Sequence, residues 1–334
     1  MKLLVTGGAG FIGSNFIRYM LAKYPDYEIV NLDKLTYAGN LDNLREIEKD
    51  KRYRFEKGDI CDVDLMAKLA KETDCIVHFA AESHVDRSIK NPFAFIDTNV
   101  KGTYALIAAA REAKHTRYVQ ISTDEVYGDM PGIQKATESS PLAPSSPYSA
   151  AKAAADMLVL TAHRTYGFPG MITRCTNNYG PYQYPEKIVP LFITNALEGK
   201  PLPMYGDGSQ IRDWLYVGDH CSAIDLVLHE GKAGEVYNVG AEQDPEITNV
   251  ALTKRILEGT GAPSTLVTHI TDRPGHDVRY AVDSSKIRAM GWKPSLDFNA
   301  GLERTINWYK SNEAWWKKIK SGDYKEWYLK HYGG

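Results

Sequence analysis

Cysteine is scarce in this chain, and the few cysteines present lie far apart. They are Cys61, Cys75, Cys175 and Cys221, which excludes a dense disulfide framework. No Cys-x-x-Cys or His-Glu-x-x-His spacing occurs, so the residue types that usually hold zinc are not arranged to do so. We therefore expect no metal site, reduced thiols and a cytoplasmic location.

Long hydrophobic runs and an excess of charge of one sign are also missing. No uninterrupted apolar stretch has the length that crosses a membrane. The chain begins Met1-Lys2-Leu3 without the apolar core and cleavage site of a signal peptide, so none is expected. The formal net charge of -2 gives no electrostatic reason to expect a nucleic acid or an acidic membrane as partner.

The 334 residues do contain an alternation of short β-branched runs with longer amphipathic segments. This alternation predicts an α/β fold, a Rossmann-type doubly wound parallel sheet with helices on both faces. We expect strands at residues 2–6, 28–32, 54–57, 75–79, 117–122 and 171–174. We expect helices at residues 11–23, 63–71, 93–114 and 148–166.

A glycine pattern follows the first expected strand. Gly7, Gly10 and Gly13 have the spacing Gly-x-x-Gly-x-x-Gly between that strand and a helix, which allows a tight turn and close approach of the backbone to a pyrophosphate. Asp33 ends the second strand about 20 residues further on, where a carboxylate binds ribose hydroxyls and repels a 2′-phosphate. The pattern predicts NAD rather than NADP, with Asp59 beside the adenine. The alternative is a purely structural turn with Asp33 as a helix cap.

The sequence changes character near Asn177, where turn-forming and aromatic residues become frequent. We assign residues 1–178 to an NAD-binding Rossmann domain and residues 179–334 to a smaller α/β substrate-binding domain. The apolar run at 236–239 could rejoin the first sheet. We expect further helices at 188–198, 219–229 and 249–258, and a docking helix within the tail at 302–332.

Tyr148 and Lys152 lie four residues apart at the start of an expected helix, so they share one helix face. We expect the Lys152 ammonium to lower the pKa of the Tyr148 phenol, which could then exchange a proton with a sugar hydroxyl. Thr123, Asp124 and Glu125 follow an expected strand. Adjacent carboxyl groups repel, so one can stay protonated while the other is ionised, as an elimination requires. The alternative is a surface Tyr–Lys pair and a helix cap at Asp124.

These motifs together carry a family resemblance. The glycine pattern with Tyr-x-x-x-Lys resembles the extended short-chain dehydrogenase/reductase superfamily. Within it, the chain resembles the dTDP-glucose 4,6-dehydratase family over nearly its full length, in the segments 80–88, 123–128, 174–183, 210–217 and 272–277. The family usually has serine where Thr176 stands.

The resemblance implies a reaction. The enzyme would be an NAD-dependent hydro-lyase of deoxysugar biosynthesis that converts dTDP-glucose to dTDP-4-keto-6-deoxyglucose. Tyr148 would remove the O4 proton while the C4 hydride leaves, with Thr123 hydrogen-bonded to the O4 region. Glu125 would then take the C5 proton, Asp124 would protonate the departing C6 hydroxyl, and the hydride would return to C6. Lys152 would also reach the nicotinamide ribose.

The candidate ligand contacts form two sets. Near the cofactor we expect Gly7, Gly10, Phe11, Ile12, Gly13, Asp33, Lys34, Thr36, Asp59, Ile60, Ala80, Ala81, Ser83, Asn99, Ser122, Tyr148, Lys152 and Asn177. Near the substrate the resemblance implies Ser83, His84, Thr123, Asn178, Lys187, Ile188, Pro203, Tyr205, Arg212, Asn249, Arg273 and His276. Arg212 and Arg273, helped by Lys187, are the candidates for the substrate pyrophosphate, because guanidinium groups bind such anions bidentately. For either arginine, a surface salt bridge is the alternative.

Other functions are weighed against this one. A nucleotide-sugar 4-epimerase of the same superfamily would keep Tyr148, Lys152 and NAD but would need neither Asp124 nor Glu125. A decarboxylase would need a cationic pocket for a uronic carboxylate, and a non-catalytic NAD-binding protein would need only the glycine turn. Thymidine and uridine both stay open, because pockets distinguish a methyl group weakly.

The expected helices at 93–114 and 148–166 are rich in alanine, which permits close helix approach. The resemblance implies a homodimer in which such helices form a four-helix bundle. The alternative is that the alanines pack against the chain's own sheet.

Overall fold

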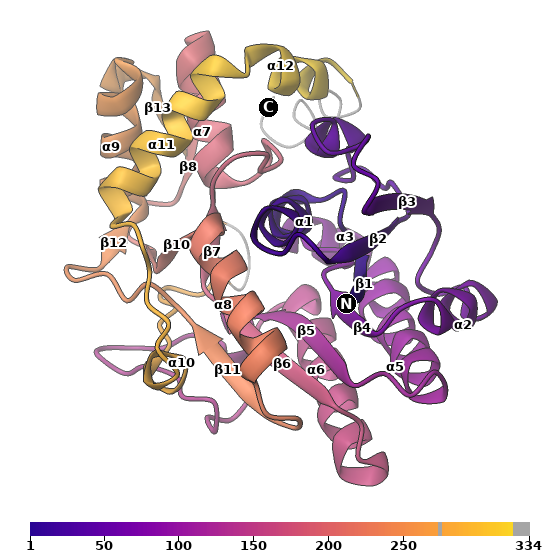
Figure 1. Cartoon of the computed structure of the whole chain (residues 1–334). Helices are drawn as coiled ribbons and strands as arrows, with labels where there is room; N and C mark the ends of the chain where they lie inside the picture. Colours follow the sequence, from indigo (N-terminus) through magenta and orange to yellow (C-terminus); the bar gives the residue numbers. More distant parts are fainter. Residues whose placement is uncertain (273–275, 323–334) are drawn as a thin grey trace.

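A seven-stranded parallel sheet forms the centre of the protein (Figure 1), a computed structural model that describes residues 1–272 and 276–322. The strand order is β11-β6-β5-β4-β1-β2-β3, and every neighbouring pair is parallel. The strands are β1 (Lys2–Thr6), β2 (Glu28–Asp33), β3 (Tyr53–Lys57), β4 (Cys75–His78), β5 (Arg117–Thr123), β6 (Gly170–Cys175) and β11 (Val236–Val239). The predicted doubly wound α/β fold is confirmed.

Helices cover both faces of this sheet, because alternate strand residues are apolar on each side. On β1, Leu3 and Val5 belong to the hydrophobic cluster that includes α1 (Phe11–Lys23) and α8 (Val217–Glu230). Leu4 points the other way and packs in the cluster under α2 (Val63–Lys71), α5 (Thr103–Glu112) and α6 (Pro147–Tyr166). The strand order reverses between β1 and β4, which opens a crevice at the carboxyl ends of the strands.

The expected helix at 93–114 is divided. It consists of α4 (Pro92–Phe95), the π-helical segment η2 (Ile96–Gly102) and α5. Within η2, the Asn99 side chain accepts a hydrogen bond from the Glu82 N–H (2.9 Å) and donates one to the Glu82 carbonyl (3.0 Å). We attribute the widened turn to this cross-link between η2 and the loop after β4. The short helices α3 (Val85–Lys90) and α10 (Ser285–Ala289) were not expected.

A second hydrophobic cluster, formed by residues between Tyr179 and Trp316, lies beside the sheet. Its helices are α7 (Ile188–Glu198), α9 (Asn249–Thr260), α11 (Phe298–Ser311) and α12 (Glu313–Ser321). Its strands pair two by two: β7 (Asn177–Tyr179) with β10 (Trp214–Tyr216), β8 (Leu202–Tyr205) with β13 (Val267–Ile270), and β9 (Ile211–Arg212) with β12 (Ile247–Thr248). Short 3-10 turns are η1 (Leu41–Leu44), η3 (Asp124–Tyr127) and η4 (Ser264–Leu266).

The chain returns to the first sheet after entering this second cluster. β11 pairs with β6, so the run at 236–239 does join the sheet. The division at residue 178 stays a prediction. Of the expected tail helix, α11 and α12 cover the part up to Ser321, and residues 323–334 lie outside the described part of the chain.

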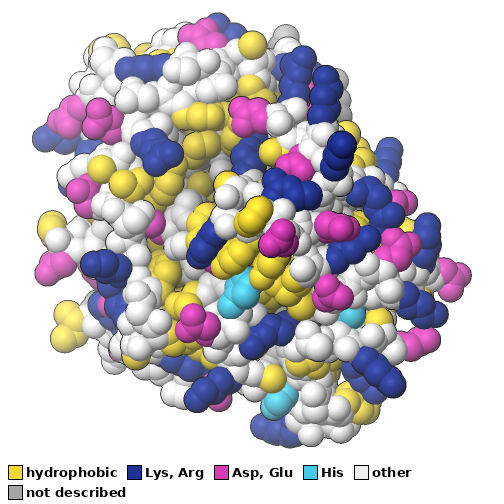
Figure 2. All heavy atoms as spheres, in the orientation of Figure 1, with side chains coloured by type: hydrophobic (Ala, Val, Ile, Leu, Met, Phe, Trp, Pro, Cys, Tyr) yellow, Lys and Arg dark blue, Asp and Glu magenta, His cyan; other side chains and the backbone are white. Residues whose placement is uncertain are grey.

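The surface carries charges of both signs. Figure 2 shows acidic and basic side chains interspersed over one face of the molecule. Among residues 1–272 and 276–322, no helix is both long and apolar enough to cross a membrane. The same ranges contain no group of three or more His, Cys, Asp or Glu side chains placed to hold a metal ion. The four cysteines are unpaired.

Candidate active site

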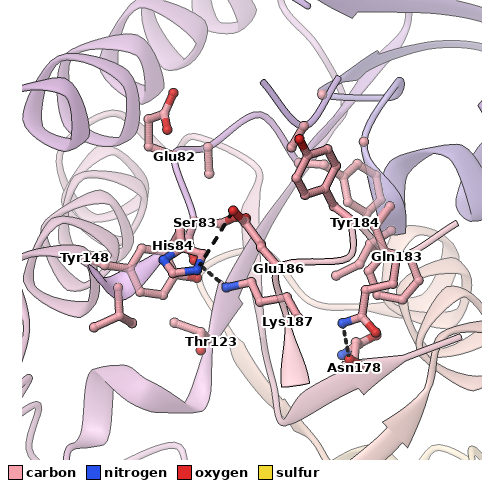
Figure 3. A pocket seen from close by; sticks show the side chains of 18 of the residues that line it. Glu82, Ser83, His84, Thr123, Tyr148, Asn178, Gln183, Tyr184, Glu186 and Lys187 are labelled. Atoms are coloured by element: carbon pink, nitrogen blue, oxygen red, sulfur yellow. Dashed lines mark hydrogen bonds and ion pairs between the residues drawn. The ribbon is translucent and has the colours of Figure 1, made fainter. Parts of the chain in front are cut away.

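A single cavity of about 420 Å³ runs along the carboxyl ends of the parallel strands and continues to α7 and β8. The glycine turn and Asp33 line one end, and Tyr205 and Asn249 line the other. Figure 3 shows the middle of this cavity, where Thr123, Tyr148, His84 and Lys187 face one another from different elements. The cavity therefore joins the predicted cofactor and substrate positions in one space.

The glycine turn allows close backbone approach where a dinucleotide is expected. Gly7 has φ +72°, and a Cβ there would lie 2.5 Å from the Ala80 nitrogen. A Cβ at Gly13 would lie 2.5 Å from the Gly7 carbonyl oxygen. Gly10 is the N-cap of α1 and supplies no side-chain cap, so the first N–H groups of the helix stay available to an anion.

Asp33 stands at the end of β2 beside this turn. Its carboxylate accepts hydrogen bonds from the Leu35 N–H (2.8 Å) and the Ala9 N–H (2.9 Å). Burial raises the pKa of Asp33, and these two N–H donors partly offset the effect. Because a carboxylate has about four acceptor positions, capacity remains for ribose hydroxyls. The turn and this acid therefore fit an NAD molecule.

Lys34 Nζ and Asp59 Oδ2 form an ion pair, 2.6 Å apart, in the part of the cavity where the cofactor is expected. Every predicted cofactor residue lines the cavity except Asn99. Asn99 is only 1% exposed and holds the backbone of Glu82, so it shapes the wall from behind.

β5 ends at Thr123 and delivers the two acids into the cavity. Thr123 Oγ1 donates to Asp124 Oδ1 (3.2 Å) and accepts the Glu125 N–H (3.3 Å), which starts η3. Burial, and then the charge of Glu125, raise the pKa of Asp124 well above its ordinary value. Its Oδ2 is buried without a hydrogen-bond partner among the described residues. Both effects favour the protonated form of Asp124, and Glu125 beside it is only partly buried.

α6 presents Tyr148 and Lys152. The helix begins with a capping box in which Ser146 Oγ accepts the Ser149 N–H (3.1 Å), and Pro147 occupies the first helical position. This start fixes Tyr148 in the first turn, inside the cavity. Lys152 follows one turn later, and its Nζ donates to the Ile121 carbonyl (2.6 Å).

The expected lowering of the Tyr148 pKa was wrong for this structure. Burial, and then the charge of Glu125, raise the pKa of the phenol well above its ordinary value. Burial also lowers the pKa of Lys152, whose ammonium is bound to a backbone carbonyl. Sequence spacing revealed the shared helix face but not the depth of burial, which dominates here.

The sugar-side candidates lie together around the middle of the cavity. Lys187 Nζ donates to the Ser83 carbonyl (2.9 Å), and the His84 ring lies 3.8 Å from the Glu186 carboxylate (Figure 3). Asn178 accepts a hydrogen bond from Gln183 through its backbone carbonyl (2.8 Å). Ile188 also lines the cavity.

The nucleotide-side candidates lie at the end formed by β8, β9 and α9. Pro203, Tyr205, Arg212, Asn249 and His276 all line the cavity. The Arg212 guanidinium lies 4.3 Å from the Tyr280 ring centre and donates to the Asp277 carbonyl (2.9 Å). Arg273 lies outside the described residues.

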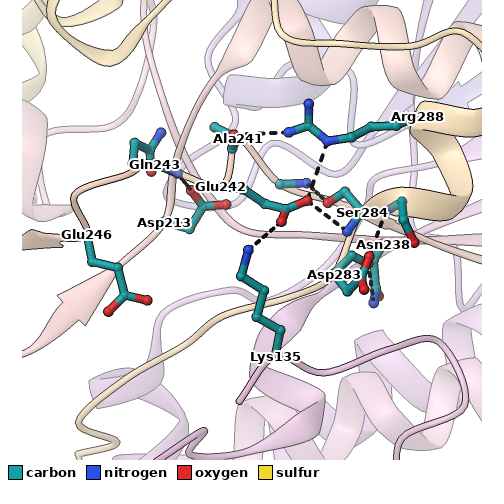
Figure 4. A network of polar contacts seen from close by, with 12 residues as sticks. Lys135, Asp213, Asn238, Ala241, Glu242, Gln243, Glu246, Asp283, Ser284 and Arg288 are labelled. Atoms are coloured by element: carbon teal, nitrogen blue, oxygen red, sulfur yellow. Dashed lines mark hydrogen bonds and ion pairs between the residues drawn. The ribbon is translucent and has the colours of Figure 1, made fainter. Parts of the chain in front are cut away.

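A polar network supports Arg212 from behind. Glu242 accepts hydrogen bonds from the Ser284 N–H (3.0 Å) and from Lys135 Nζ (2.5 Å), and Asp213 accepts the Gln243 N–H (3.3 Å) (Figure 4). Burial raises the pKa of Asp213. These contacts fix the loop after β11 against the strand that carries Arg212.

Glu186 is the main cavity residue that sequence reasoning missed. It is 5% exposed, accepts a hydrogen bond from the Tyr37 hydroxyl (2.9 Å), and lies 3.5 Å from Arg87 Nε. Burial raises the pKa of Glu186. A signal was present, because a charged Glu186-Lys187 pair stands directly before an apolar helix.

Comparison with known proteins finds similar proteins over nearly the whole length of this chain. A family model described as GDP-mannose 4,6 dehydratase matches residues 4–305. A dTDP-glucose 4,6-dehydratase of Streptomyces niveus is 52% identical over 329 residues, covering 97% of each chain. The structure of DesIV, a dTDP-glucose 4,6-dehydratase of Streptomyces venezuelae solved with NAD bound, has a TM-score of 0.93 and 52% identity, covering 96% of this chain and 100% of its own. A UDP-glucose 4-epimerase of Thermus thermophilus is 31% identical, with a TM-score of 0.87, covering 93% of this chain and 100% of its own.

Proposed function

Because this chain belongs to the dTDP-glucose 4,6-dehydratase family, we infer that it is an NAD-dependent hydro-lyase that converts dTDP-glucose to dTDP-4-keto-6-deoxyglucose. The observation that carries this inference is the acid pair. Asp124, a buried carboxylic acid, and Glu125 share one cavity with Tyr148, Lys152 and the glycine turn. A 4-epimerase would not need these acids, so it is not favoured.

We propose that residues of this cavity carry out the proton transfers that the reaction needs. When NAD is bound, it accepts the C4 hydride and later returns it to C6. We propose that Tyr148 removes the O4 proton, and that positive charge near the phenol, from the Lys152 ammonium and from the cationic nicotinamide ring of bound NAD, offsets the burial that raises its pKa. The 4-keto group that results makes the C5 proton acidic.

The acid pair then eliminates water. Glu125 takes the C5 proton as base, while Asp124 gives its proton to the C6 hydroxyl, which leaves as water. A C5–C6 double bond forms. Hydride addition at C6 and protonation of C5 by Glu125, whose proton has exchanged with solvent, complete the product. Solvent then takes a proton from Tyr148 and returns one to Asp124, which restores both residues. Among the residues that the structure describes, Oδ2 of Asp124 has no hydrogen-bond partner, which supports its assignment as the proton donor.

We propose that the remaining cavity residues bind the nucleotide. Arg212, with Arg273 and Lys187, is proposed to hold the pyrophosphate, and Ser83 and His84 to lie beside the sugar. Residues 1–178 would bind NAD and residues 179–334 the nucleotide sugar, with α8 and β11 completing the first unit. We also propose a cytoplasmic location, which the four cysteines without a disulfide support.

A homodimer is also proposed. Phe93 is 79% exposed, Tyr104 53% and Met157 46%, and they lie on α4, α5 and α6. Ala150 of α6 is exposed as well, whereas Ala109, Ala110, Ala151, Ala153 and Ala155 are buried within the chain, so the apolar side chains carry this proposal. A four-helix bundle would cover them.

Incubation with dTDP-glucose tests the function directly. The 4-keto-6-deoxy product has an alkaline absorbance that the substrate lacks, and we expect it to appear with catalytic turnover. A side-by-side rate with UDP-glucose would settle the base preference. Absence of turnover with any nucleotide hexose would refute the dehydratase assignment.

A further inference from the structure

The glycine turn is held from behind by a chain of hydrogen bonds that begins in the C-terminal helix α12. Trp315 Nε1 donates to Asn43 Oδ1 (2.9 Å), and Asn43 Nδ2 donates to the Ala9 carbonyl (2.9 Å). The Ala9 N–H in turn donates to Asp33 Oδ2 (2.9 Å). Four elements that are distant in sequence are thereby joined: α12, η1, the β1–α1 turn and the end of β2.

These hydrogen bonds fix the peptide groups on both sides of Ala9. The Ala9 carbonyl accepts a second hydrogen bond from the Asn40 N–H (3.0 Å). Asn43 is 1% exposed and Ala9 is fully buried, so the loss of a partner would leave a polar group unsatisfied inside the protein. The orientation of Ala9 sets where the following N–H groups of the turn point, and its own N–H positions the carboxylate of Asp33.

α12 packs against this region through aromatic contacts and an ion pair. The Tyr182 ring lies 3.9 Å from the Arg18 guanidinium of α1, and its centre is 4.6 Å from the Trp308 ring and 5.8 Å from the Trp315 ring. A surface ion pair joins Lys318 to Asp42, next to Asn43 in η1. Figure 1 shows α12 lying beside the segment between β2 and β3.

Neither Asn43 nor Trp315 lines the cavity, so any effect on a ligand must act through Ala9 and Asp33. We propose that Asn43 and Trp315 are positioning residues for NAD, which hold the phosphate turn and the ribose acid in their binding geometry and slow NAD release. The inference rests on the proposed function for the identity of the dinucleotide. A hydride that leaves C4 and returns to C6 requires the same NAD molecule throughout one turnover, which gives this restraint its purpose.

The test compares two neighbouring tryptophans of α12. Trp315→Phe keeps an aromatic ring and removes the hydrogen bond to Asn43. Trp316→Phe is the control, because it removes an indole hydrogen bond to the Tyr309 carbonyl (2.8 Å) from the same helix at a fully buried position, and so reports what a loss of packing in α12 does by itself. The dissociation constant and release rate of labelled NAD are measured by equilibrium dialysis and gel filtration of the full-length protein.

We expect Trp315→Phe to weaken NAD binding about 5- to 10-fold, because the turn and Asp33 would no longer be held in the binding geometry before NAD binds. Trp316→Phe should stay within about 2-fold of the wild type. At saturating NAD, kcat of Trp315→Phe should change less than about 2-fold, because no reacting group is altered. If Trp315 acts through Asn43, adding Trp315→Phe to Asn43→Ala should weaken NAD binding little further.

Two results would overturn the inference: wild-type NAD affinity in Trp315→Phe, or the same loss of affinity in both tryptophan variants. A failure of the proposed function has a different signature, because the wild-type protein would then not turn over dTDP-glucose, whereas the effect of Trp315→Phe is read from NAD binding alone. Thermal midpoints of all variants are recorded beside the binding data, and a loss of affinity that simply follows the midpoint counts against the inference.

Discussion

At the scale of single residues, the chemistry depends on two neighbouring carboxyl groups in different surroundings. Asp124 is 3% exposed and keeps one oxygen without a partner among the described residues, whereas Glu125 is only partly buried. On this difference we propose Asp124 as the acid and Glu125 as the base. Both assignments lead to measurements that separate them.

Replacing Glu125 should remove the base alone. Glu125→Gln is expected to slow exchange of the C5 proton with solvent at least about 100-fold, since an amide cannot take the proton. The dissociation constant for dTDP-glucose should change less than about 3-fold. Deuterium incorporation from heavy water measures the first quantity and calorimetric titration the second. Equal losses in both would indicate a structural role, and Asp124→Asn, which keeps the base, is the matched control.

Replacing Asp124 should alter how stability depends on pH. Its raised pKa means that the folded protein holds a proton that the unfolded chain releases above about pH 4. The free energy of unfolding of the wild type therefore falls as the pH rises above about 4, and Asp124→Asn lacks this loss. The midpoint of the variant minus that of the wild type should grow by about 2 °C or more between pH 4 and pH 8.

Scanning calorimetry at several pH values measures this difference. A difference for Asp124→Asn that stays constant from about pH 4 to pH 8 would show that Asp124 is ionised in the folded protein, and another proton donor would then be needed.

Sequence reasoning found the residues whose signal is local. The glycines, Asp33, the acid pair and the Tyr148–Lys152 pair are recognisable because each lies within one turn or one strand end. Asn43 and Trp315 are separated by 272 residues, and nothing near either one indicates that they meet. The pKa of Tyr148 was also beyond reach, because it depends on burial by several elements.

At the scale of elements, α1 and α8 are joined by a group of hydrogen bonds and ion pairs centred on Asp225. Its buried carboxylate accepts hydrogen bonds from Lys23 (2.6 Å) and Tyr24 (3.0 Å), and it pairs with His229 (2.9 Å). Burial alone would raise the pKa of Asp225, but hydrogen bonds from His229, Lys23 and Tyr24 lower it overall. The hydrogen bond to Asp225 raises the pKa of His229.

The contacts of Asp225 should stabilise the folded protein most within a defined range of pH. The lowered pKa of Asp225 contributes stability that is lost as pH falls below about 4, and the raised pKa of His229 contributes stability that is lost as pH rises above about 6.5. Asp225→Asn should therefore cost most between these values, about 2 to 4 kcal/mol of the free energy of unfolding. Urea denaturation at pH 3.5, 5.5 and 8 measures the cost, and an equal cost at all three would contradict the account.

The alternation of strands and helices along the chain was predictable, since β-branched runs alternate with segments of helical periodicity in the sequence. The π-helical turn η2 was not, because its cause is the contact of Asn99 with the distant backbone of Glu82. The same limit applies to α3 and α10, which are too short to show a period of 3.6 residues.

At the scale of the whole molecule, the exposed apolar side chains of α4, α5 and α6 predict the oligomeric state. Light scattering of the wild type should give about twice the chain mass of 37.4 kDa, as a C2 dimer requires. Phe93→Glu should shift it to the monomer, because a charge would be buried in the bundle. Ile133 is 96% exposed and lies outside these helices, so Ile133→Glu should stay dimeric. A monomeric wild type would refute the dimer.

The central claim is that one hydride leaves C4 and returns to C6 while neighbouring acids expel water. Turnover of dTDP-glucose that carries deuterium at C4 tests this most directly, with the product analysed by nuclear magnetic resonance. We predict that the deuterium appears at C6 of the 4-keto-6-deoxy sugar, with solvent hydrogen at C5. Deuterium that is lost to solvent or to free dinucleotide, or that is retained at C4 of an epimerised sugar, would contradict the account.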